Sequence, residues 1–172
     1  MEIQTERLRM RLHRAEDFDA SAEMWADPEV VRHISGVPAS REQSWSRLLR
    51  YSGHWTLLGY GYWLVEERET GEFVGEVGFA DFHRDIQPSL DGIPELGWVL
   101  ARRAHGKGYA TEAVLASLRW AKAHFTPSTQ IACIIAPSNV ASVRVAEKCG
   151  FRLWRDGHYQ NSPVRFYIRA SG

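Results

Sequence analysis

The sequence predicts an α/β fold that is built on a mixed sheet. Segments typical of strands and segments typical of helices alternate along the whole chain. Three strand-like segments follow one another directly between residues 60 and 101, which predicts an antiparallel meander. Helical segments separate the later strands, and crossovers of this kind can place strands in parallel. We therefore expect helices on a sheet that is not all parallel.

The N-terminal part is predicted to hold one strand and three helices. Residues 7–13 alternate polar and apolar side chains, which is typical of a half-buried strand. A helix with an acidic first turn is expected over residues 15–25. Asp27, followed by proline, is typical of an N-cap and opens a second, short helix. The capping-box pattern at residues 40–43 opens a third helix, which runs toward Tyr51.

The later part of the chain is predicted to be a meander followed by alternating helices and strands. A Glu-Thr-Gly-Glu hairpin turn joins the first two strands of the meander, and Gly150 closes the last helix. The expected strands cover residues 60–68, 72–82, 95–101, 130–135, 151–155 and 162–169, and the expected helices cover residues 108–125 and 139–149.

Composition narrows the class of protein. The chain has 172 residues, 44% of them hydrophobic and 24% charged, which fits one globular domain over residues 1–172. The 21 basic and 21 acidic residues cancel, so no overall field attracts nucleic acid or membranes. No apolar run approaches the roughly 20 residues of a membrane span, and the polar start predicts no secretory signal. Cys133 and Cys149 are expected to be buried, reduced thiols of a cytoplasmic protein, and no metal-ligand spacing is found.

The most informative segment is the basic, glycine-containing turn at residues 102–108, which lies between a strand and a long helix. Gly106 and Gly108 allow a ligand to approach the backbone closely. The following helix presents free N–H groups and a positive dipole end at the same place. The segment lacks the Lys-Ser/Thr ending of a P-loop and the third glycine of a dinucleotide fingerprint. On its own, it is either a pyrophosphate site or a plain turn.

This segment resembles the Arg/Gln-x-x-Gly-x-Gly/Ala signature of the GNAT superfamily of N-acetyltransferases, carried here by Arg103, Gly106 and Gly108. The opening at residues 5–12 and 27–30, the hairpin at residues 69–78 and the segment 139–151 resemble the branch typified by ribosomal-protein N-terminal acetyltransferases. These similarities occur in order along nearly the whole chain. They imply the GNAT-like fold, a mostly antiparallel mixed sheet with helices on both faces and a splayed parallel pair of strands in its middle.

The resemblance also implies a binding site for acetyl-coenzyme A. The strand before the turn would carry a bulge, which Gly97 permits, and would bind the pantetheine arm through its main chain. Main-chain N–H groups of the turn would bind the pyrophosphate, and Asn139 would contact the cofactor arm or simply cap its helix. The implied cofactor-binding residues are Trp98, Val99, Leu100, Arg103, His105, Gly106, Lys107, Gly108, Tyr109, Ala110, Thr111, Asn139 and Ser142.

The implied reaction is direct attack of a bound primary amine on the thioester within a ternary complex. Glu95 is the expected base, since it begins the splayed strand; its alternative role is an ion pair with an arginine. The Val99 N–H would stabilise the oxyanion. The tyrosine that serves many members as general acid is replaced by Ala146, and Ser142 matches the serine proposed for the ribosomal-protein branch.

The leading interpretation is therefore an acyltransferase that acetylates a protein N-terminus or a small-molecule amine. The alternative is a catalytically silent sensor or scaffold that binds acyl-coenzyme A. No nucleic acid or membrane is expected as a partner, and homodimers are common among similar proteins. An aromatic group is expected toward the acceptor side, mostly as packing residues. It consists of Trp45, His54, Trp55, Tyr60, Tyr62 and Trp63.

Overall fold

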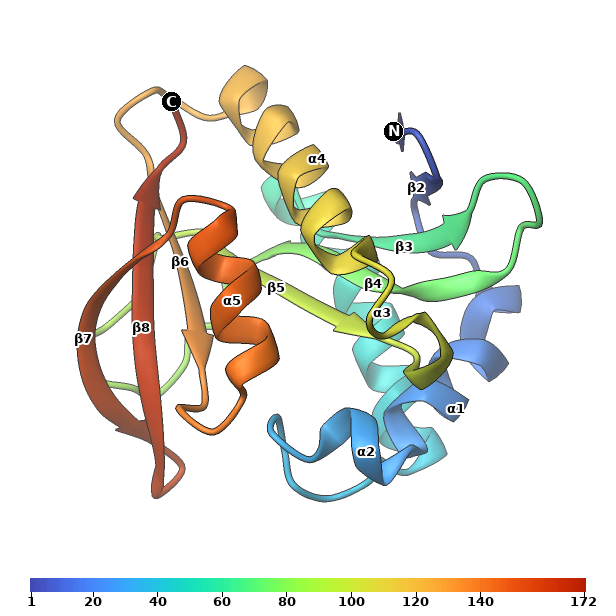
Figure 1. Cartoon of the computed structure of the whole chain (residues 1–172), viewed down its shortest axis with the longest axis horizontal. Coiled ribbons are helices and arrows are strands. Elements are labelled where there is room, and N and C mark those ends of the chain that lie inside the picture. Colours follow the sequence, from blue (N-terminus) through green and yellow to red (C-terminus); the bar gives the residue numbers. More distant parts are fainter.

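Eight strands form one sheet in the computed structural model, which describes residues 1–172 (Figure 1). The strands are β1 (Glu2–Gln4), β2 (Leu8–Arg11), β3 (Tyr62–Glu67), β4 (Phe73–Ala80), β5 (Glu95–Leu100), β6 (Gln130–Ile135), β7 (Arg152–Tyr159) and β8 (Ser162–Ala170). In space they follow the order β1-β2-β3-β4-β5-β6-β8-β7. Only β5 and β6 are parallel neighbours, so the expected mixed, mostly antiparallel sheet is confirmed.

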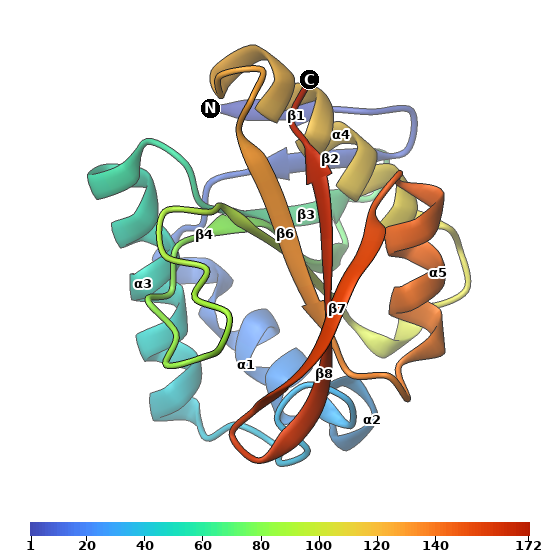
Figure 2. The ribbon, with the colours of Figure 1, turned by 90° about the vertical axis from the view of Figure 1, so that its left-hand side faces the viewer.

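Helices cover both faces of the sheet, as expected. Figure 2 shows α4 on one side of strands β3 and β4, and α1 on the other. The helices are α1 (Phe18–Ala26), α2 (Pro28–Val31), α3 (Arg41–Leu58), α4 (Tyr109–His124) and α5 (Val140–Lys148), with short 3₁₀ turns η1 (Ala15–Asp17) and η2 (Arg102–Ala104).

Local capping signals fix where the helices begin. The Asp27 carboxylate accepts a hydrogen bond from the Glu29 N–H at 2.9 Å, which starts α2. Ser40 and Gln43 form the expected capping box at the start of α3. Helix α3 continues past the expected Tyr51 to Leu58, where the left-handed Gly59 (φ 74°) ends it.

Two edges of the sheet depart from the sequence-based expectation. The short strand β1 was not expected, because it has only three residues, of which Glu2 and Gln4 are polar and exposed, and its only strand partner is β2. Strand β7 runs on to Tyr159, well beyond the expected end at Arg155, because it pairs with β8 over its whole length. Most of its residues are exposed, so hydrophobic periodicity carries little signal there.

The largest core lies between the sheet and α4. Trp63 is fully buried and meets Trp120 edge-on, with ring centroids 5.2 Å apart and planes at 79°. Edge-on contact suits the aromatic quadrupole, and burying each large side chain contributes about 1.5–3 kcal/mol. Trp55 packs against both of these rings. The aromatic group expected on the acceptor side is thus divided, since Tyr62 packs on the opposite face with Tyr51.

The opposite face of the sheet holds a fully buried carboxylate. Glu76 on β4 accepts hydrogen bonds from Ser21 Oγ at 2.6 Å and Trp25 Nε1 at 2.9 Å, both on α1. His13 Nε2 lies 3.4 Å from Glu76 Oε1. Burial alone would raise the pKa of Glu76, but these partners together hold it below its usual value of 4.5. The carboxylate therefore fastens α1 to the middle of the sheet.

We expect Glu76→Gln to lower the free energy of unfolding by about 1–3 kcal/mol at pH 7, because buried partners lose a charged acceptor. The folded-state pKa of Glu76 is lowered, so its contribution is complete above pH 4.5 and disappears as the pH falls through the folded value. Urea denaturation at a series of pH values should show the difference between variant and wild type shrinking below pH 4.5. Glu29→Gln, at an exposed surface ion pair, is the control and should change little. A pH-independent difference would contradict this account.

Candidate active site

The turn between β5 and α4 presents a row of unpaired backbone donors. Gly106 and Gly108 have left-handed φ angles of 74° and 79°, which would strain any other residue. Gly108 is also the residue before α4, so no side chain caps the helix. The Glu112 N–H is the first in the helix to find an acceptor, the Gly108 carbonyl at 3.1 Å. The N–H groups of residues 106–111 have no acceptor in the chain, and they add to the positive end of the helix dipole.

Basic side chains at this turn mainly hold it in place. Arg103 donates Nη2 to the carbonyl of Phe73 on β4, and His105 Nε2 lies 2.9 Å from the Leu100 carbonyl oxygen. Lys107 Nζ lies 3.8 Å from a carboxylate on β3. The free hydrogen-bond donors at this turn are therefore mostly backbone N–H groups. The ligand contacts here were expected to come from such groups.

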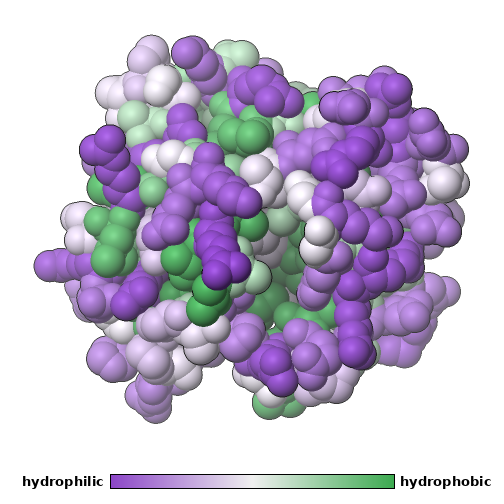
Figure 3. Space-filling view, viewed as in Figure 1, coloured by the Kyte–Doolittle hydropathy of each residue, from purple (hydrophilic) through white to green (hydrophobic).

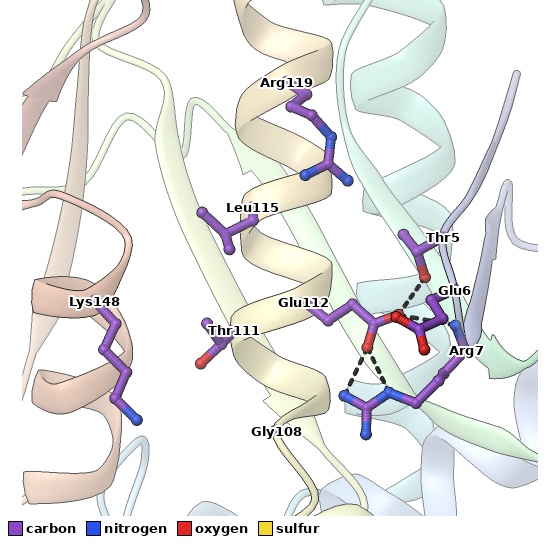
Figure 4. A pocket seen from close by; sticks show the side chains of 9 residues that line it. All are labelled: Thr5, Glu6, Arg7, Gly108, Thr111, Glu112, Leu115, Arg119 and Lys148. Atoms are coloured by element: carbon purple, nitrogen blue, oxygen red, sulfur yellow. Dashed lines mark hydrogen bonds and ion pairs between the residues drawn. The ribbon is translucent and has the colours of Figure 1, made fainter.

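An ion pair from the far N-terminus holds the same turn. Arg7 donates Nε to Glu112 at 2.7 Å (Figure 4). Its Nη1 donates to the Lys107 carbonyl at 2.9 Å. The Thr5 hydroxyl donates to Glu112 at 2.6 Å. Burial alone would raise the pKa of Glu112, but Thr5 and Arg7 hold it below its usual value. Sequence reasoning missed this clamp, because its members are 105 residues apart.

A groove of about 530 Å³ crosses the exposed side of α4 next to this clamp (Figure 4). It brings together residues from the β1–β2 turn, α4 and the end of α5. Arg119 on α4 and Lys148 at the end of α5 add positive charge, and Glu112 is already neutralised by Arg7. With Glu6 as the remaining carboxylate, the lining has a small excess of positive charge. The lining residues are Thr5, Glu6, Arg7, Gly108, Thr111, Glu112, Leu115, Arg119 and Lys148.

Strands β5 and β6 separate almost at once. They pair at a single position, Glu95 with Ala132, and the Ala132 N–H donates to the Pro94 carbonyl at 3.1 Å. Beyond it, β5 stays with β4 and β6 stays with β8. Figure 3 shows a recess with hydrophobic colouring between α5 and the segment that follows β5. The expected splayed pair is therefore present.

Backbone alternation decides which groups of β5 face this opening. The Ala101 N–H donates to the Val74 carbonyl at 2.9 Å, and the β4–β5 register continues from there without a shift. Since alternate residues bond the same neighbour, the Val99 N–H faces β4, whereas Trp98 and Leu100 face the opening. The bulge expected in this strand is absent, so that expectation was wrong. The ladder also occupies the Val99 N–H that was expected to serve the oxyanion.

On the other side of the opening, Asn139 and Ser142 begin α5. The Asn139 side-chain oxygen accepts the Ser142 N–H at 3.2 Å, so Asn139 does cap the helix. Its amide NH₂ group makes no hydrogen bond within the chain, and the Ser142 side chain is partly exposed.

Helices α1 and α3 pack on the face of the sheet opposite α4, and we call this side the α1–α3 face. A tyrosine hydroxyl lies over β5 on this face. The Tyr62 hydroxyl lies where a side chain at Gly97 would have to be, so a β-carbon there would collide with it. Tyr51 stacks on Tyr62 with ring centroids 4.4 Å apart and planes at 6°, which fixes the ring. Burial, reinforced by the charge of Glu95, raises the pKa of Tyr62, so the hydroxyl keeps its proton. Glycine at position 97 thus makes room for this hydroxyl rather than for a bulge.

Glu95, the expected base, forms an ion pair at the start of β5. Its two carboxylate oxygens accept hydrogen bonds from Arg84 Nε and Nη2, both at 2.8 Å. Burial alone would lower the pKa of Arg84, but Glu95 raises it above its usual value. Phe82 and Tyr159 lie against the guanidinium, at 4.4 and 5.0 Å from ring centroid to Cζ. Nothing in the sequence identified Arg84, because it lies in an irregular loop with no periodic pattern.

The two cysteines offer no nucleophile. Both are free and buried, as expected. Burial raises the pKa of Cys133 and Cys149, the latter to about 11, so neither is a thiolate near neutral pH.

Comparison with known proteins agrees with this geometry. A family model described as "Acetyltransferase (GNAT) domain" matches residues 7–152. The chain belongs to the GNAT acetyltransferase family. It is 32% identical over 169 residues to the protein YkkB of Bacillus subtilis (strain 168), covering 95% of this chain and 93% of that one. An uncharacterized N-acetyltransferase of Bacillus licheniformis is 26% identical, with coverage of 99% and 89%. This GNAT chain is therefore an acyltransferase.

Solved GNAT structures have the same fold. A putative GNAT-family acetyltransferase of Bordetella pertussis superposes with a TM-score of 0.86 at 28% identity, over 99% of each chain. Two more distant structures show the fold alone. A ribosomal L7/L12 α-N-protein acetyltransferase in complex with coenzyme A has a TM-score of 0.77 at 16% identity, covering 99% and 98%. Spermidine N-acetyltransferase of Vibrio cholerae, in complex with coenzyme A and spermine, has a TM-score of 0.74 at 16% identity, covering 97% of each chain.

No helix of this GNAT chain has the length and apolar character that crossing a bilayer requires.

We expect Gly108→Ala to weaken coenzyme A binding by at least about tenfold, because a β-carbon at φ 79° strains the turn by about 1–2 kcal/mol and shifts its donors. Calorimetric titration with coenzyme A is the measurement. Gly59→Ala is the matched control, since its φ is 74° and it ends α3 away from the turn. An added β-carbon meets nothing within 4 Å at Gly59 and only Arg7 Nη2, at 3.5 Å, at Gly108, so neither position is blocked. Both variants should lose similar stability, and only Gly108→Ala should lose affinity. Equal affinities would exclude a role for this turn in binding.

Proposed function

We propose that residues 1–172 form one N-acetyltransferase domain that transfers the acetyl group of acetyl-coenzyme A to a primary amine by direct attack in a ternary complex. One observation carries the proposal: the opening between β5 and β6 lies beside the unpaired N–H groups at the start of α4. An open strand edge beside a run of free donors suits a ligand that is an amide-containing arm attached to a pyrophosphate.

The residues present fit coenzyme A. Unpaired N–H groups of residues 106–111 would hold the pyrophosphate, and the basic groove with Arg119 and Lys148 suits a further phosphate. Trp98 and Leu100 offer main-chain groups to the pantetheine arm, although the Leu100 carbonyl is already in contact with His105. The coenzyme A in the two distant GNAT structures supports this assignment. When bound, the cofactor supplies an activated acetyl thioester.

On the open side of β5, we assign the Trp98 N–H as the donor to the acetyl carbonyl oxygen. It replaces the Val99 N–H in this role, because the sheet ladder turns the latter toward β4. Asn139 keeps its free NH₂ group for the cofactor arm while its oxygen caps α5.

Proton transfer is assigned to side chains near the same strand. Glu95 would take the proton of the amine through a lone pair that Arg84 leaves free, directly or through water. Ser142 would protonate the leaving thiolate, as the resemblance implies. The Tyr62 hydroxyl is a second candidate for this step, because it lies over Gly97 and remains protonated.

A silent acyl-coenzyme A sensor is the second candidate function. The observation that favours it is the bidentate Arg84–Glu95 pair, which occupies the only acid at the start of the splayed strand. The same cofactor site would then serve binding alone.

The remaining assignments concern the protein's setting. We assign the enzyme to the cytoplasm, because its two cysteines are unpaired thiols. The exposed Leu153 and Trp154 on edge strand β7 support a homodimer.

Glu95→Gln should lower kcat by about 10²-fold or more while the Kd for acetyl-coenzyme A changes less than about twofold, because the amide keeps the shape but accepts no proton. Coenzyme A release in the presence of an amine acceptor measures kcat, and calorimetry measures Kd. Glu23→Gln, at an exposed position on α1, is the control. An unchanged kcat would remove Glu95 from catalysis. Wild-type binding without acetylation of any amine would favour the sensor.

Dephospho-coenzyme A should bind about tenfold or more weakly than coenzyme A, because the groove across α4 would lose a charge-assisted contact. Arg119→Ala and Lys148→Ala should each narrow this difference. Calorimetric titration with both ligands is the measurement. Equal affinity of the two ligands for the wild-type protein would mean that no basic group binds the 3′-phosphate, and failure of both to bind at millimolar concentration would overturn the proposed function.

A further inference from the structure

Helix α3 carries arginines on the face that lies over the proposed reaction site. Tyr51 on this helix stacks on Tyr62, whose hydroxyl lies over Gly97. Arg47 precedes Tyr51 by one helical turn and therefore lies on the same face. Its guanidinium stacks on Trp25, whose Nε1 donates to Glu76 on β4, and Glu76 pairs with Val99 on β5. Arg47 thus borders the same space as the α1–α3 face of β5.

Arg47 has no anionic partner of its own. Its guanidinium stacks on the Trp25 ring, with Cζ 3.6 Å from the ring centroid. No carboxylate lies within ion-pair distance, and its Nη1 atom is buried without a hydrogen-bond partner. Burial lowers the pKa of Arg47, as happens to a cation whose charge is only partly compensated. A buried charged donor without an acceptor is costly, unless a ligand supplies one.

Neighbouring carboxylates are committed elsewhere. Glu76 accepts hydrogen bonds from Ser21 and Trp25 and has His13 beside it. Glu95 is neutralised by Arg84 in a bidentate pair. Arg50, exposed on the same side of α3, stacks on Phe82 and has no ion pair.

The face that must admit the amine therefore carries an excess of positive charge. An ammonium group that arrives alone meets like charges, which weakens its binding. An acceptor that brings its own anion removes this repulsion and satisfies the free donor. The charged side chains around this space are Arg47, Arg50, Arg84, Glu76 and Glu95, with His13 behind Glu76.

We propose that the acetyl acceptor is a primary amine that also carries a carboxylate, and that Arg47 binds this carboxylate. A guanidinium fork matches a carboxylate through two parallel hydrogen bonds, which would give the buried Nη1 its acceptor. Polyamines, which carry several ammonium groups and no anion, are disfavoured. The proposal rests on the acetyl transfer proposed above, and it names the substrate class of that site.

Matched acceptors test the proposal. Glycine, β-alanine and γ-aminobutyrate are each compared with the corresponding amide, and a peptide beginning Ser-Asp is compared with one beginning Ser-Asn. We expect at least one acid to exceed its neutral partner by about tenfold or more in kcat/KM. The acid–amide pair that shows this difference tells whether the carboxylate-bearing acceptor is a free amino acid or an acidic peptide. Acetyl-coenzyme A binding is measured separately by calorimetry.

Variants assign the effect to Arg47. Arg47→Ala should reduce the ratio of acid to amide toward one without changing the Kd for acetyl-coenzyme A. Arg47→Gln preserves most of the side-chain volume and carries the test if the alanine variant does not fold. Arg32→Ala, at an exposed arginine paired with Glu29, is the control and should keep the wild-type ratio. A thermal melt confirms that each variant is folded.

The other possible results would overturn either the acceptor proposal or the proposed function. Neutral amines that react as fast as the acids, or a ratio that Arg47→Ala and Arg47→Gln leave unchanged, would overturn the acceptor proposal and leave acetyl transfer intact. Bound acetyl-coenzyme A with none of these acids acetylated would also overturn it. Failure to bind acetyl-coenzyme A would instead overturn the proposed function itself.

Discussion

The single residue pair that joins β5 to β6 is the constraint on which the site depends. Because the two strands part after Glu95 and Ala132, the main-chain groups of Trp98 and Leu100 that face away from β4 have no neighbouring strand, although they lie in the middle of the sheet. An unpaired strand edge of this kind occurs at the border of most sheets, where water satisfies it. Here it lies inside the molecule, between α5 and the turn that leads into α4, where a ligand can replace the missing strand.

The N-terminal residues reinforce both ends of this opening. Arg7 reaches the turn before α4 through Glu112 and the Lys107 carbonyl, while α1 is tied to β4 through Glu76. Both carboxylates have pKa values below the usual one, so both contacts persist at neutral pH. The two sides of the proposed site are therefore held by the same N-terminal segment, which keeps their relative position fixed.

Local signals in the sequence predicted most helices and strands, whereas contacts between residues far apart in the chain were not predicted. The capping box at Ser40 and the glycines of the turn act within a few residues, so their patterns can be recognised directly. The Arg84–Glu95 pair depends on the path of an irregular loop. Whether the N–H of Val99 or that of Trp98 faces the opening depends on the register of β5 with β4. Neither can be obtained from residue spacing in one segment.

The state of the two thiols has a practical consequence for assays. A reagent that detects free sulfhydryl groups would report coenzyme A as it is released, and a reactive protein thiol would add a background signal. Cys133 and Cys149 are buried and protonated, so the folded protein should contribute almost nothing. Unfolding exposes both thiols, so the same reagent then measures the number of unfolded molecules. One colour reaction can thus follow turnover in the native enzyme and the loss of its fold on heating.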